Sequence, residues 1–134
     1  MKLNESAEKV RTHLLELGID EFEESEGLFK VDCDRRCLQN MFITVNETQV
    51  VFDQHIFDLP KDKTPTELAG IYERLLMMSG ELVYGAFVLD KTGTKVLFHD
   101  TLAVDNLDLN ELGETLEAVS LCYTEHAAEI RGFL

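Results

Sequence analysis

Two cysteines in the segment VDCDRRCLQN, residues 31–40, are the first residues that could do chemistry. Three residues separate Cys33 from Cys37, and two aspartates and two arginines surround the pair. A structural zinc site needs four ligands, commonly two Cys-x2-Cys knuckles or added histidines. This chain offers one Cys-x3-Cys and a distant Cys122, without the Cys-x-x-Cys of a redox motif. We therefore predict no metal site and no cofactor, and interpret Cys33 and Cys37 as residues that flank a turn between two strands.

A second possible site combines histidine with aspartate. His99 precedes Asp100, and Asp53 lies two residues before His55. If the strands that carry them pair, imidazole and carboxylate groups lie side by side, and such groups can transfer protons. However, the patterns G-x-S-x-G, H-E-x-x-H and the phosphate-binding loop do not occur. We predict no catalytic residue, with a small metal- or His/Asp-dependent enzyme as an alternative.

The charge of the chain limits its partners. The 134 residues contain 26 acidic and 12 basic side chains, a formal net charge of −14. Nucleic-acid binding depends on Lys and Arg that replace counterions, and anionic membrane surfaces also attract basic segments, so neither partner is expected. We find no apolar run of about 18 residues and no secretory leader pattern, and therefore expect a cytoplasmic protein with reduced thiols and no membrane insertion.

Three helices are expected to position these residues. Apolar residues recur at helical spacing in the first helix, and Gly18 suits the position after its end. Residues 64–67, TPTE, have the composition of a capping box with Pro at the first helical position. The apolar stripe of this second helix is wide enough to meet two surfaces. A third helix is predicted from an Asp108 cap, with Glu111 at its third position, to Arg131.

Period-2 alternation predicts strands over 28–33, 37–45 and 49–57, and a hairpin over 82–90 and 95–102 with Gly93 in its turn. Gly85 within a strand indicates a bulge or the close approach of another backbone. The acidic segment 19–27 is interpreted as a loop or a weak edge strand around Phe22. The expected order is α-β-β-β-α-β-β-α. It predicts a single α+β domain over 1–134, with two layers: a five-stranded antiparallel sheet and helices on one face.

The segment 75–119, LLMMSGELVYGAFVLDKTGTKVLFHDTLAVDNLDLNELGETLEAV, resembles the type III secretion chaperone-like fold. Class I chaperones of the Tir-chaperone kind and the YbjN-type family share this fold. The matching positions are Gly85, Ala86, Phe87, Leu89, Asp90, Gly93, Leu102 and Leu112. The resemblance implies a non-enzymatic homodimer built from the second helix and the strand after it. We assign that interface to Leu68, Ile71, Leu75, Met78, Val83 and Gly85.

The resemblance also implies a polypeptide partner, a secreted effector or a regulatory protein, held as an extended segment on apolar patches and a sheet edge. If the second and third helices fill the covered face of the sheet, the first helix packs at the edge and leaves apolar surface free. We predict peptide binding by Val10, Leu14, Leu17, Phe29 and Val31. The function expected is a chaperone-like or regulatory polypeptide-binding module. The second alternative is an orphan interaction protein of the same fold, which only dimerises or docks.

Overall fold

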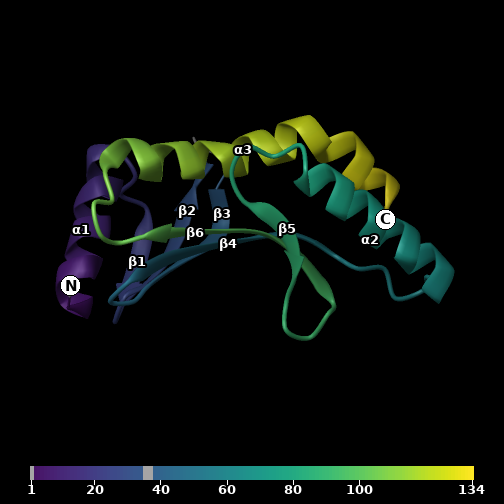
Figure 1. Ribbon diagram of the computed structural model, residues 1–134, viewed down its shortest axis with the longest axis horizontal. Helices are drawn as coiled ribbons and strands as arrows, with labels where there is room; N and C mark the ends of the chain where they lie inside the picture. Colours follow the sequence, from purple (N-terminus) through teal and green to yellow (C-terminus); the bar gives the residue numbers. More distant parts are fainter. Residues whose placement is uncertain (1, 35–37) are drawn as a thin grey trace.

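The computed structural model describes residues 2–34 and 38–134 and is shown in Figure 1. Within the described residues, three helices and six strands follow one another along the chain. Their bounds are α1 (Leu3–Glu16), β1 (Phe22–Ser25), β2 (Leu28–Cys33), β3 (Leu38–Val45), β4 (Gln49–Asp58), α2 (Pro65–Ser79), β5 (Ala86–Leu89), β6 (Lys95–Ala103) and α3 (Leu109–Gly132).

The described strands form one antiparallel sheet in the order β1-β2-β3-β4-β6-β5. The predicted five-stranded sheet was wrong by one strand, because the acidic segment adds β1 at the edge. Phe22 lies against Phe29, with 5.5 Å between the ring centroids, and Arg11 of α1 binds both carboxylate oxygens of Glu24 at 2.6 and 2.7 Å. Tertiary contacts of this kind stabilise a strand whose own composition disfavours one.

Helices α1 and α3 lie on one face of the sheet (Figure 1). α1 contacts β3 and α3, and α3 crosses above the sheet to reach β4. α2 instead lies beyond the end that carries β5, beside the C-terminal half of α3 (Figure 1). The long side chains that face the helices are fully buried, among them Phe29, Phe52 and Phe98. The two-layer α+β architecture is therefore confirmed, but α1 and α3, rather than α2 and α3, cover most of the sheet.

Two helices begin as their sequences predict. At α2, the Thr64 hydroxyl oxygen accepts from the Glu67 N–H at 3.2 Å, and the Glu67 carboxylate accepts from the Thr64 N–H at 3.0 Å. At α3, the Asp108 carboxylate accepts from the Glu111 N–H at 2.7 Å. Both capping predictions are confirmed, because these hydrogen bonds depend only on residues within one turn.

The segment between α2 and β5 is shaped by Gly85. Strand β5 begins only at Ala86, so the predicted strand over 82–90 was too long at both ends. Gly85 has a φ of +75°, and a Cβ placed there would lie 2.9 Å from the His99 carbonyl oxygen and collide with the Phe98 ring. The predicted close approach of another backbone is thus confirmed. We call residues 80–85, which join α2 to β5, the α2–β5 link.

Candidate functional site

The cysteines of the described residues lie in the core. Cys33 ends β2 and pairs across the sheet with Leu38, the first residue of β3, so the strands on both sides of the predicted corner are neighbours. Cys37, Arg35 and Arg36 lie outside the described residues. Burial, with a smaller contribution from the negative charge of Glu125, raises the pKa of the Cys122 thiol to about 12. Such a thiol stays protonated at neutral pH and is a poor nucleophile or metal ligand.

The histidine–aspartate cluster is brought together only in part. Pairing of β4 with β6 places Asp53 opposite His99, with 2.7 Å between Asp53 Oδ1 and His99 Nδ1. His55 instead lies 2.8 Å from Asp58, and Asp100 faces α3, where it accepts from the Thr115 hydroxyl at 3.4 Å. Within the described residues, no three His, Cys, Asp or Glu side chains are grouped to hold a metal. Among the described residues, the result is one half-buried contact between His99 and Asp53, on the face of the sheet that the helices do not cover.

The residues predicted to bind a peptide are mostly core residues. Val10, Leu14, Phe29 and Val31 are fully buried, and Leu17 is half-buried against the same core. The premise that α1 leaves its stripe free is therefore corrected. Because α2 lies beyond the end of the sheet, α1 has room to pack on the sheet itself. The role of these five residues in peptide binding stays a prediction.

The residues predicted at a dimer interface also divide by burial. Ile71, Leu75 and Met78 are buried within the protomer, and Leu68 and Gly85 are half-buried. Val83 is 87% exposed. The neighbouring apolar side chains that face solvent are Leu76, 73% exposed, and Met77, 53% exposed. We call Leu76, Met77 and Val83 the α2 patch.

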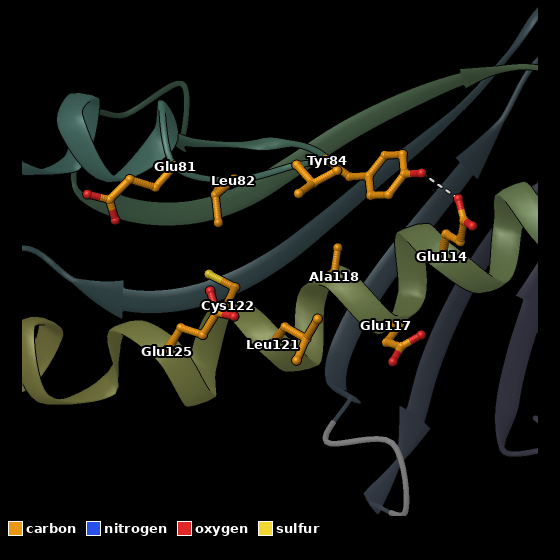
Figure 2. A pocket seen from close by; sticks show the side chains of 10 residues that line it. Glu81, Leu82, Tyr84, Glu114, Glu117, Ala118, Leu121, Cys122 and Glu125 are labelled. Atoms are coloured by element: carbon orange, nitrogen blue, oxygen red, sulfur yellow. Dashed lines mark hydrogen bonds between the residues drawn. The ribbon is translucent and has the colours of Figure 1, made fainter.

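A groove lies between the α2–β5 link and α3, with a volume of about 300 Å³ (Figure 2). The α3 side chains that line it recur at steps of three and four residues, and so form one stripe along the helix. They are Glu114, Glu117, Ala118, Leu121, Cys122 and Glu125. The link contributes the opposite wall, Glu81–Tyr84. We call this feature the link–α3 groove.

Its two ends are polar and its middle is apolar. At one end, the Tyr84 hydroxyl donates a hydrogen bond to Glu114 across the groove (Figure 2). This bond and the charge of Glu114 raise the pKa of Tyr84 above its ordinary value. Glu81 and Glu125 lie at the other end, and Leu82 and Ala118 between the two ends (Figure 2). The groove can therefore hold an apolar group between carboxylates, but the groups that line it offer no activated nucleophile.

This groove was not predicted from the sequence, although one of its two walls has a recognisable pattern. The most regular apolar stripe of α3 is the one that packs on the sheet, and it includes Leu112, Leu116 and Val119. A second stripe at helical spacing, running from Glu114 to Glu125, is visible in the same residues. The opposite wall could not be predicted, because the sequence of residues 82–85 has the apolar pattern of a strand.

Comparison with solved structures gives the same fold. YbjN from E. coli matches with a TM-score of 0.66 and 14% identity over 92% of each chain. The Yersinia pestis type III secretion chaperone SycH, solved in complex with a stable fragment of YscM2, matches with a TM-score of 0.59 and 21% identity, over 89% of this chain and 98% of that chain. No curated protein gives a significant match.

Two further findings concern the chain as a whole. Among the described residues, no helix is both long enough and apolar enough to cross a membrane. The family model described as CesT_Tir_1 matches residues 3–134, nearly the full length. The resemblance seen in the sequence is thereby confirmed, and the chain belongs to the CesT_Tir_1 family.

Proposed function

We propose that the protein is a non-enzymatic, cytoplasmic polypeptide-binding module with a chaperone-like or regulatory role. The observation that carries this proposal is the gathering of exposed apolar side chains around one end of the fold. The α2 patch, the link–α3 groove and Leu121, which is 47% exposed, lie there on neighbouring elements. Apolar groups that face water on three adjoining elements are typical of a surface that binds another polypeptide.

An adjacent strand edge supports the same function. β5 pairs with β6 on one side and ends the sheet on the other. Ser79 accepts a hydrogen bond from the N–H of Phe87 at 2.9 Å, and so covers part of that free edge. An extended partner segment can add main-chain hydrogen bonds at such an edge while its side chains occupy apolar pockets. SycH, of the same fold, was solved with a polypeptide fragment bound.

We also propose that two copies associate through the α2 patch. Leu76 and Met77 leave more than half of their surface in water, which is costly unless a partner covers them. The buried Ile71, Leu75 and Met78 would then contribute to the interface indirectly, by fixing the position of α2 within each copy. An interaction protein that only dimerises through this patch is the second candidate function.

Isothermal titration tests the binding function. The titrants are unstructured peptides that represent the N-terminal segments of proteins encoded beside this one. We expect saturable binding by at least one peptide, at one segment per chain or per dimer. If none of the peptides binds while the protein is folded and associates with itself, the polypeptide-binding function is wrong and the second candidate is favoured.

A further inference from the structure

We infer that the link–α3 groove takes a basic segment of the partner polypeptide, in which an apolar side chain is flanked by lysine or arginine. This inference rests on the proposed function and names the chemistry of its partner. The groove lining carries the carboxylates of Glu81, Glu114, Glu117 and Glu125, and none of the lining residues is basic.

Two of these carboxylates differ from others nearby in having no arginine or lysine bound to them among the described residues. Glu129, one helical turn beyond Glu125, is bound by Arg74 of α2 at 2.6 and 3.0 Å, and Glu24 is bound by Arg11 in the same way. Within the described part of the chain, Glu117 and Glu125 make no ion pair. A segment that covers the groove removes water from these charges, which is unfavourable unless the segment brings cations of its own.

The dimensions of the groove fit a short extended segment. Glu114 and Glu125 are three helical turns apart, roughly 16 Å along α3 at about 1.5 Å per residue. An extended chain covers that length with about five residues. Ala118 and Leu82 lie in the middle (Figure 2), where one apolar side chain of the segment would sit. Basic side chains before and after it would reach the carboxylates at the two ends.

Charge also decides between a basic partner and a second copy of this chain. A second copy docked groove to groove would bring the same four carboxylates and add its own formal net charge of −14. Like charges at close range oppose such a contact, whereas a cationic segment is attracted. Val83 belongs to both the α2 patch and the groove lining, so self-association and segment binding meet at this residue.

Fluorescence anisotropy with designed peptides tests the inference. The probes are fluorescein-labelled peptides of about ten residues, long enough to span the groove with short flanks. They share their leucines and differ only in whether lysine, serine or glutamate surrounds them. The protein is compared with three variants. E117Q/E125Q removes two groove charges, and E47Q/D62N removes two exposed charges elsewhere. A118W fills the middle of the groove.

We expect the lysine peptide to bind best and to lose affinity with added salt. E117Q/E125Q should lower the affinity for the lysine peptide roughly three- to tenfold, which is the effect of losing two exposed ion pairs. A118W should lower this affinity further. E47Q/D62N should match the unchanged protein. Melting curves confirm that each variant is folded, and since Glu117 and Glu125 are exposed, their variant keeps the test valid if A118W fails to fold.

The inference is overturned if the three peptides bind equally, or if E117Q/E125Q binds the lysine peptide as the unchanged protein does. It is also overturned if E117Q/E125Q leaves peptide affinity alone but tightens self-association, because a second copy would then occupy the groove. If a peptide binds with an affinity that changes neither with its charge nor with A118W, the groove is not the binding site, but the polypeptide-binding function stands. Failure of every peptide, whatever its charge, counts against the proposed function itself.

Discussion

At the scale of single residues, Gly85 fixes the wall of the groove against the sheet. Its positive φ turns the α2–β5 link into β5, and its lack of a Cβ lets the Phe98 ring and the His99 carbonyl approach. Gly93 also has a positive φ, but nothing lies within 4 Å of the place where its Cβ would be. Comparing substitutions at the two glycines therefore distinguishes the cost of backbone strain from the cost of steric collision.

We predict that Gly85→Ala lowers the free energy of unfolding by roughly 2–4 kcal/mol, because backbone strain and overpacking add. Gly93→Ala should cost only about 1 kcal/mol, since backbone strain acts there alone. Urea unfolding of both variants measures the difference. Equal losses would show that the tight contact around Gly85 does not constrain the link.

At the scale of elements, a bidentate ion pair joins α2 to α3 beside the groove. Arg74 binds both carboxylate oxygens of Glu129, and this contact lowers the pKa of Glu129 below its ordinary value of 4.5. A group whose pKa is lowered by folding stabilises the fold above its unfolded pKa. That contribution is lost as the pH falls through the folded value.

We therefore predict that Glu129→Gln lowers the melting temperature at neutral pH, and that the difference from the unchanged protein disappears well below pH 4.5. Thermal melts across this range provide the measurement. Glu125→Gln, one turn earlier and without an ion pair among the described residues, is the control and should have little effect. A difference that persists unchanged in acid would contradict the stabilising role of the ion pair.

The same elements show what the sequence could predict. The helix starts at Thr64 and Asp108 and the alternating strands follow from local patterns, and the structure confirms them. Strand β1 and the burial of the α1 stripe depend on contacts between distant segments, such as Arg11 with Glu24. The His99–Asp53 contact was foreseen because it needed only strand pairing. The groove was missed because it needs the α2–β5 link to leave the sheet at Gly85.

At the scale of the whole molecule, an excess of negative charge accompanies exposed apolar surface. A formal net charge of −14 keeps copies apart in solution, whereas the α2 patch favours their association. Salt screens the repulsion without weakening apolar contacts. Self-association through the α2 patch should therefore strengthen with moderate salt, and binding of a basic segment should weaken.

We predict that the protein sediments as a dimer at micromolar concentration, and that Leu76→Ser with Met77→Ser shifts it toward the monomer. Leu15 of α1 is 52% exposed and far along the chain from the α2 patch, so Leu15→Ser is a matched control that should leave the dimer intact. Sedimentation velocity at several concentrations reports the change. A clean monomer for the unchanged protein at high micromolar concentration would rule out the dimer.

Hydrogen exchange of the protein with and without the lysine peptide locates a bound segment without any substitution, and so shows whether the link–α3 groove holds it. We predict slower exchange in residues 80–85 and 114–125, and little change on α1 and β1–β3. Protection confined to the uncovered face of the sheet, or no protection at a saturating peptide concentration, would contradict this prediction.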